Sequence, residues 1–250
     1  MAKTVEAREG KIKGACLKIT TIVNDWRASV AGGMETALLL WEACCVPSLL
    51  HGAGTWTDMS RETEQRLNSL QQWYLRLVLQ VGPGAPLPSL LWDFTCLEMG
   101  LRVDREKVML ALHCRRLGED SLAGRVYMEQ QAREWPGLAK EASDICEKLG
   151  IESCDVTTLS KGEYRKTVTA ACHKLNEERL RDQSRGKQKC ERIVGEEYEM
   201  KTYVLNEKIE DVRSMYRTRF QLLPFASNYS HSKNYEKTNY VRGREKTSSI

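Results

Sequence analysis

The side chains that could perform chemistry in this chain are its carboxylates, histidines and cysteines, and their spacing predicts no catalytic or metal site. The nine cysteines include no Cys-x-x-Cys pair, so the spacing typical of zinc ribbons and dithiol oxidoreductases is absent. Neither a Gly-x-Ser-x-Gly motif nor a phosphate-binding glycine loop is present. The histidines His51, His113, His173 and His231 are isolated in the sequence. We therefore predict no enzymatic activity, no catalytic residues, no bound metal and no cofactor.

Lysines and arginines in the last third of the chain could instead contact a polyanion. Residues 1–160 hold 18 Lys and Arg against 21 Asp and Glu, a net charge of −3, whereas residues 161–250 hold 20 against 13, a net charge of +7. Cations at this density bind phosphates without reading base sequence. Six of them form the predicted nucleic-acid site: Arg185, Lys187 and Lys189 in a loop around Gly186, and Arg213, Arg217 and Arg219 on the last predicted helix. Arg242, Arg244 and Lys246 extend this basic region.

The elements that must position these residues are helices. The central one is a predicted helical hairpin between Leu38 and Gly82, in which an apolar run from Leu38 to Leu50 precedes a long amphipathic helix. Ser60 is a plausible N-cap for that second helix, and Gly82-Pro83-Gly84 is expected to stop it. Its apolar residues recur at spacings of three and four: Leu67, Leu70, Tyr74, Leu77, Val78 and Val81. The apolar run is too short to span a membrane, and we expect its helix to bend or end near Pro47.

Three stretches also resemble a known family: VPSLLHGAGTWT (Val46 to Thr57), QQWYLRLVLQVGPGAPLPSLLWDF (Gln71 to Phe94) and LEMGL (Leu97 to Leu101). They are similar to the region after the palm in reverse transcriptases of non-LTR (LINE-type) retrotransposons, which comprises the thumb and the helical part beyond it. The positions that match are Pro47, Leu49, Leu50, Gly52 and Trp56, of which Pro47, Gly52 and Trp56 are the predicted structural motif. The departures are His51, where the family has an aromatic residue, and Gly54, where it has glutamate.

The resemblance implies a segment without its catalytic parts. Reverse transcriptases hold two divalent ions with carboxylates from an aromatic-x-Asp-Asp turn, and this chain contains no Asp-Asp pair. The palm would lie upstream of residue 1. The Cys/His motif that often follows the helical region in the family is also missing, because no cysteine follows Cys190.

We predict an all-α fold, an irregular helical array around the central hairpin, with three regions. Residues 1–132 form a thumb-like helical domain, residues 133–225 a second helical region and residues 226–250 a disordered basic tail. The first helix, the hairpin and the helix from Leu101 should share one core, with Trp56 buried as a plug between the hairpin's helices. The helices from Tyr164 and Asn206 should form a second, looser pack.

Two functions remain open from the sequence. In one, the chain is a non-catalytic helical domain that binds the RNA or DNA backbone weakly and without sequence specificity. In the other, it is a helical protein-interaction module or an inert remnant, and glutamates such as Glu191, Glu196 and Glu197 cancel the basic loop. Because no secretory signal accompanies the nine cysteines, we expect an intracellular protein in a reducing compartment, nuclear or cytoplasmic, without a membrane partner. Its protein partners are not predicted.

Overall fold

The computed structural model describes residues 2–27, 32–57, 59–151, 159–220 and 222, and the all-α prediction is confirmed. Helices account for 78% of the residues, and the described part contains no strand. In chain order the elements are α1 (Ala2–Arg27), α2 (Gly33–Leu40), a π-helical turn (Trp41–Cys45), α3 (Val46–Leu49), a 3-10 turn (Ala53–Thr55), α4 (Arg61–Leu79), α5 (Leu87–Trp92), α6 (Met99–Leu117), a 3-10 turn (Gly118–Asp120), α7 (Leu122–Ala132), α8 (Leu138–Leu149), α9 (Lys161–Ser184), a 3-10 segment (Gln188–Gly195), α10 (Thr202–Asn206) and α11 (Ile209–Arg219).

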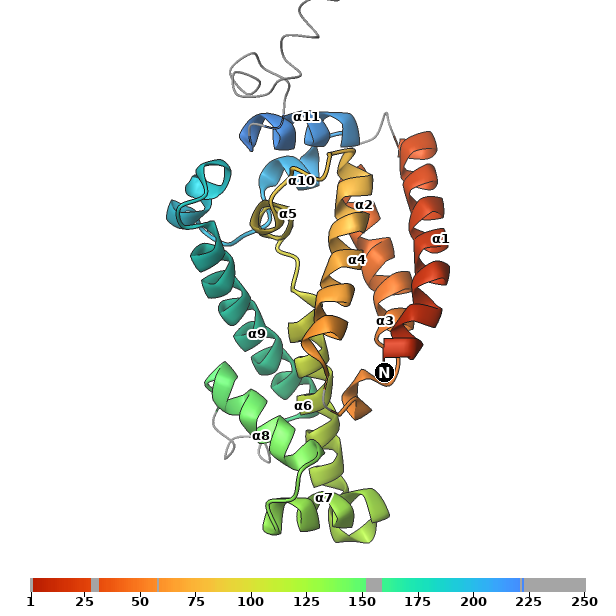
Figure 1. Cartoon of the computed structure of the whole chain (residues 1–250), viewed down its shortest axis with the longest axis vertical. Helices are drawn as coiled ribbons and strands as arrows, with labels where there is room; N and C mark the ends of the chain where they lie inside the picture. Colours follow the sequence, from red (N-terminus) through yellow and green to blue (C-terminus); the bar gives the residue numbers. More distant parts are fainter. Residues whose placement is uncertain (1, 28–31, 58, 152–158, 221, 223–250) are drawn as a thin grey trace, which may run out of the picture.

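The molecule is elongated, with its helices arranged around α4 and α6 (Figure 1). α1 and α9 lie on opposite sides of the view, α10 and α11 cover one end, and α7 and α8 form the other end. No helix in the described part combines the length and the apolar character that crossing a bilayer requires.

The predicted hairpin is present, and its first helix ends at Leu49, two residues after Pro47. α2 continues into α3 through the π-helical turn, where the Val46 amide donates to the Trp41 carbonyl five residues back. Since proline has no amide to donate, the wider turn lets the helix pass Pro47 without an interior break. Trp41 stacks on Tyr74 of α4 with ring centroids 4.7 Å apart, and the Tyr74 hydroxyl donates to the Ala37 carbonyl at 2.6 Å. These contacts close the hairpin.

Helix α4 begins where its sequence predicts. The Ser60 hydroxyl accepts a hydrogen bond from the Thr63 amide, as an N-cap does. The helix ends at Leu79, because Gln80 adopts a left-handed conformation with φ of 51° before the predicted stop at Gly82 is reached.

The first core contains α1, the hairpin, α5 and the last helix, α11. Tyr216 of α11 stacks near Phe94 at 5.8 Å, and its hydroxyl shares a 2.7 Å hydrogen bond with Ser89. Val212 and Phe220 are also fully buried in this core. The prediction that the helix from Asn206 joins a second pack is therefore wrong, because its apolar face closes the first core.

The second core joins α6, α8 and the first half of α9. Leu101, Val108 and Leu112 of α6 meet Ile145 of α8 there. The α9 residues that are buried recur at every fourth position: Tyr164, Val168, Cys172, Asn176, Leu180 and Ser184. This spacing drifts around the helix, so α9 contacts the second core with its first turns and the first core, through Leu180, with its last.

Both cores draw residues from either side of residue 132. The predicted division of the chain into a region of residues 1–132 and a region of residues 133–225 therefore stays a prediction. The predicted tail, residues 226–250, lies outside the described residues, as do Arg242, Arg244 and Lys246. Trp56 packs against the first core but is only half-buried, so the prediction of a buried plug is wrong. Trp41, which is 1% exposed, occupies the hairpin interior instead.

The two tryptophans provide a matched test of this packing. We expect Trp41→Ala to lower the free energy of unfolding by about 3–5 kcal/mol, as truncation of a buried aromatic residue does. Trp56→Ala should cost less than half as much, because its side chain already contacts solvent. Urea denaturation of both variants measures the difference, and equal costs would contradict the placement of Trp41 in the hairpin interior.

Candidate nucleic-acid interface

The loop that follows α9 holds the exposed half of the predicted nucleic-acid site. Arg185, Lys187 and Lys189 are exposed, and so is Arg192, which lies outside the predicted set. Gly186 adopts φ +74°, a left-handed conformation that favours glycine, and it turns the chain at the end of α9. The sequence signal that could have identified Arg192 is its place in the same polar run, three residues after Lys189.

Buried apolar residues anchor this loop to the first core. Cys190 and Ile193, in the 3-10 segment after α9, are both 0% exposed, and Leu180 of α9 belongs to the same core. The exposed cations lie between Leu180 and Ile193, and Cys190 is buried among them. The loop is therefore fixed on one side while its charges contact solvent on the other.

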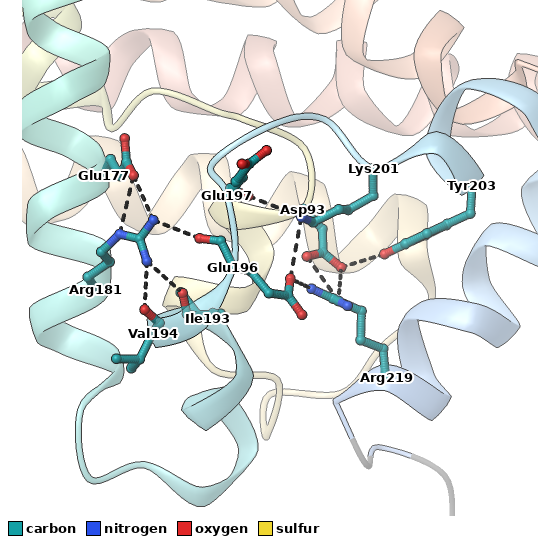
Figure 2. Close-up of polar contacts among 10 residues, drawn as sticks. All are labelled: Asp93, Glu177, Arg181, Ile193, Val194, Glu196, Glu197, Lys201, Tyr203 and Arg219. Atoms are coloured by element: carbon teal, nitrogen blue, oxygen red, sulfur yellow. Dashed lines mark hydrogen bonds and ion pairs between the residues drawn. The ribbon is translucent and has the colours of Figure 1, made fainter.

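Arg181 fixes the conformation of the loop from within (Figure 2). Its guanidinium donates to the Glu177 carboxylate at 2.8 Å and to the carbonyl oxygens of Val194 and Glu196 at 2.7 Å each. The same guanidinium lies over the Trp92 ring, 4.9 Å from its centroid. Charge-assisted hydrogen bonds of this kind are roughly twice as strong as neutral ones. A single side chain thus joins the last turns of α9 to residues 194–196, which follow the loop.

The cations of the loop have few intramolecular partners. Arg185 lies 3.3 Å from Asp182, but both side chains are about 70% exposed, and such a pair contributes little. Lys187 and Lys189 form no ion pair within the described part of the chain. Glu196, one of the glutamates expected to cancel the loop charge, bonds elsewhere. The loop therefore presents positive charge to solvent, at a helix C-terminus whose dipole also favours cations.

Arg213 and Arg217 lie outside this interface, although both belong to the predicted site. Arg213 is 1% exposed and donates to the Val78 carbonyl at 2.8 Å and to the Asn24 side chain at 2.6 Å. Arg217 donates to the Gln80 carbonyl at 2.7 Å. The last carbonyls of a helix lack intrahelical donors, and these arginines supply donors at the end of α4. Both side chains thus bond to the backbone at the end of α4, and a contact of either one with nucleic acid stays a prediction.

Arg219 is likewise held inside the protein, by Asp93 at the end of α5 (Figure 2). The Asp93 carboxyl is fully buried, lies 2.9 Å from the Arg219 guanidinium and accepts a hydrogen bond from the Tyr203 hydroxyl at 2.5 Å. Arg219 also contacts Glu196, whose carboxylate lies 3.4 Å from the Lys201 ammonium. This Asp93 cluster joins α5, the segment before α10, α10 itself and α11. No sequence signal predicts this cluster, because Asp93 lies more than 100 residues before its other members.

Burial sets the protonation of the cluster. Loss of solvation raises the pKa of Asp93 to about 6, although the positive charge of Arg219 and the hydrogen bond from Tyr203 oppose the shift. Burial also raises the pKa of Glu196, but hydrogen bonding and attraction to Arg219 outweigh it, so that this pKa is lowered overall. Folding therefore shifts the pKa values of these two carboxyl groups in opposite directions.

The predicted motif residues Pro47 and Gly52 line a separate groove of about 630 Å³ between the hairpin and α6. Lys161 and Arg165 of α9 also line this groove. Gly54, which departs from the family pattern, allows close packing here, because an added Cβ would lie 3.0 Å from the Glu106 carbonyl oxygen. Trp56 is not among the residues that line the groove.

Potential metal ligands are not clustered in the described residues. Those residues contain no group of three or more His, Cys, Asp or Glu side chains that could hold a metal ion. His51 and His113 are exposed and His173 is half-buried, while His231 lies outside the described residues. The absence of catalytic and metal sites therefore stays a prediction.

Comparisons with protein families, curated proteins and solved structures found no match to this chain.

The Asp93 cluster generates a pH prediction. A carboxyl group whose pKa is raised by folding stabilises the protein fully below its unfolded pKa, near 4, and this contribution is lost as pH rises through its folded pKa of about 6. Asp93→Asn keeps the shape without titrating. We therefore expect its stability relative to wild type to rise by on the order of 3 kcal/mol between pH 4 and pH 7. Denaturant unfolding at both pH values measures this, and a relative fall would show that the Arg219 ion pair outweighs burial.

Proposed function

We propose that the chain is a non-catalytic helical domain that binds the phosphate backbone of RNA or DNA through the loop of residues 185–192. The observation that carries this proposal is the anchored loop, in which exposed cations lack strong intramolecular partners while buried residues and Arg181 fix the backbone. A fixed loop loses little conformational entropy on binding, because its backbone is already ordered.

The composition of the loop favours weak and non-specific binding. Residues 185–192 read RGKQKCER and include four cations, one carboxylate and no aromatic side chain. Phosphate contacts position a nucleic acid without reading its bases, whereas recognition of single strands usually adds aromatic stacking. Few contacts and no stacking side chain are consistent with an affinity in the non-specific range, roughly 10⁻⁴ to 10⁻⁶ M at physiological salt.

We also propose a relationship to the region after the palm in non-LTR reverse transcriptases. It is supported by the motif of Pro47, Gly52 and Trp56 and by the order of the helical stretches that follow. Under this proposal the chain corresponds to a part that positions nucleic acid, and the catalytic carboxylates would belong to another segment.

One assay tests the absence of catalysis. Primer extension on an RNA template with Mg²⁺ should give no product above background, because the described residues contain no cluster of carboxylates that could hold two ions. Reproducible extension by the pure protein that disappears when Mg²⁺ is chelated would contradict the proposal. A reverse transcriptase with an intact palm serves as the positive control.

The alternative function, a helical protein-interaction module, is favoured by the side chains that α7 and the following turn expose. Leu122 is 71% exposed, Trp135 48%, Val126 46% and Met128 40%. Several large apolar residues on one short element are more typical of an interaction surface than of a solvated helix. Titration with single-stranded RNA separates the two functions, since this alternative needs no contact with nucleic acid.

The binding prediction concerns the loop cations. Titration of labelled single-stranded RNA at two salt concentrations should show binding that weakens with salt, because cations displace condensed counterions. The triple variant R185Q/K187Q/K189Q should reduce the slope of log K against log salt by about 2, given roughly 0.7 for each phosphate neutralised.

A second triple variant, K11Q/K18Q/K140Q, is the matched control. It removes the same charge at exposed positions on α1 and α8, so its salt slope should stay close to that of wild type. Arg102 and Lys107 are unsuitable controls, because they are 4% and 5% exposed and pair with Glu42 and Glu141. If the two triple variants changed the salt slope equally, binding would depend on the net charge of the protein and not on the loop. If wild type did not bind RNA at low salt, the protein-interaction module would be favoured.

A further inference from the structure

Two buried thiols face each other between α1 and the hairpin. The Sγ atoms of Cys16 and Cys45 lie 3.9 Å apart, and both side chains are 0% exposed. Cys16 is in the middle of α1, and Cys45 is the last residue of the π-helical turn. Neither residue contributes to the proposed binding loop, so the contact has no part in that function.

The elements around the pair hold it in place. The π-helical turn is followed by Val46 and Leu49, which are buried in the same core as Ile12 and Ile19 of α1. π-Helical turns are rare and are often found at functional sites. Here the turn places Cys45 against the first helix, so that two thiols separated by 29 residues meet in the core.

The two thiols differ in acidity, which gives them different chemical roles. A hydrogen bond with Cys45, together with burial, raises the pKa of Cys16. The same hydrogen bond lowers the pKa of Cys45, although burial opposes it. Either sulfur can be the donor of this S–H hydrogen bond, and the lowered pKa of Cys45 favours it as the first of the two to react. Thiolate character favours attack on an oxidant, and an adjacent thiol completes a disulfide.

We propose that Cys16 and Cys45 form an oxidative modification site at which hydrogen peroxide converts the facing thiols into a disulfide. The Cys45 sulfur attacks one peroxide oxygen, the O–O bond breaks, and Cys45 sulfenic acid and water form. The Cys16 sulfur then attacks the sulfenic sulfur, the S–S bond forms, and the hydroxyl group leaves with the Cys16 proton as a second water. In total, two thiols lose two protons and two electrons to one peroxide molecule.

The disulfide would lock the first helix onto the hairpin. In the reduced protein α1 is held to Cys45 and its neighbours by non-covalent packing, and a first helix of this kind can open locally. Opening also gives peroxide access to the pair, because neither sulfur reaches solvent in the closed form. Oxidation removes that motion, and a thiol reductant restores it. Closing a chain segment of this length stabilises a protein largely by restricting its unfolded state.

Peptide mapping of the full chain tests the site. The reduced protein is treated with hydrogen peroxide, its remaining thiols are alkylated, and it is digested with trypsin without reduction. Trypsin leaves Cys16 in the peptide Gly14–Lys18 and both Cys44 and Cys45 in the peptide of residues 28–61. We expect a cross-link between these two peptides. The thermal midpoint of the oxidised protein should be about 5–10 °C higher than that of the reduced protein, and dithiothreitol should reverse the shift.

Cys44, which is exposed and adjacent to Cys45, provides the matched control. Cys44→Ala should retain the cross-link and the thermal shift, whereas Cys16→Ala and Cys45→Ala should lose both. The mapping of wild type and Cys44→Ala does not depend on whether the two buried-site variants fold. A cross-link lost in Cys44→Ala, oxidation of Cys16 or Cys45 to sulfinic or sulfonic acid in place of a disulfide, or no oxidation at either residue would overturn the proposal.

Discussion

Arg213 carries a positive charge into the interior of the protein, where its guanidinium meets groups from α1 and α4 as well as from its own helix. It donates to Asn24 and to the carbonyl of Val78 and pairs with Glu210, so each of its three guanidinium nitrogens has a partner. An arginine buried without such partners would be strongly destabilising. The position of α11 therefore depends on α1 and α4 being in place, and the bond from Arg213 to Asn24 joins residues that are 189 positions apart in sequence.

The parts of this structure that depend on local sequence could be predicted, and those that depend on distant partners could not. The helix α4 and its cap at Ser60 follow from spacing within a few residues, and both are present. The arginines of α11 have the spacing of a basic surface, yet their partners are Val78, Gln80 and Asp93, more than 120 residues away. Spacing identifies a cation but does not show which carbonyl or carboxylate will reach it. The burial of Trp41 in place of Trp56 has a similar origin, because it depends on how two helices pack.

The candidate site shows the same division. Arg185, Lys187 and Lys189 were predicted from a run of charge around a glycine, and their exposure agrees with that reading. Arg181 could not be recognised from sequence as the residue that shapes the loop, because its bonds go to backbone carbonyls of a later segment. A basic run in the sequence thus indicates where positive charge can lie on the surface. The conformation of the loop is held by a neighbouring cation, Arg181, which bonds within the protein. Part of the net charge of +7 in residues 161–250 therefore belongs to cations that bond within the protein.

The π-helical turn at Trp41–Cys45 also determines which residues after it face the interior. A turn closed by a hydrogen bond to the fifth preceding residue contains one residue more than an α-helical turn. Each residue of an α-helix advances the chain by about 100° around the axis. Without the extra residue, everything from Val46 onward would be rotated by about that angle, and Leu49 and Leu50 would leave the core that they now fill. One additional residue therefore determines which side chains of the following turn point inward. The length of this segment is as constrained as its composition.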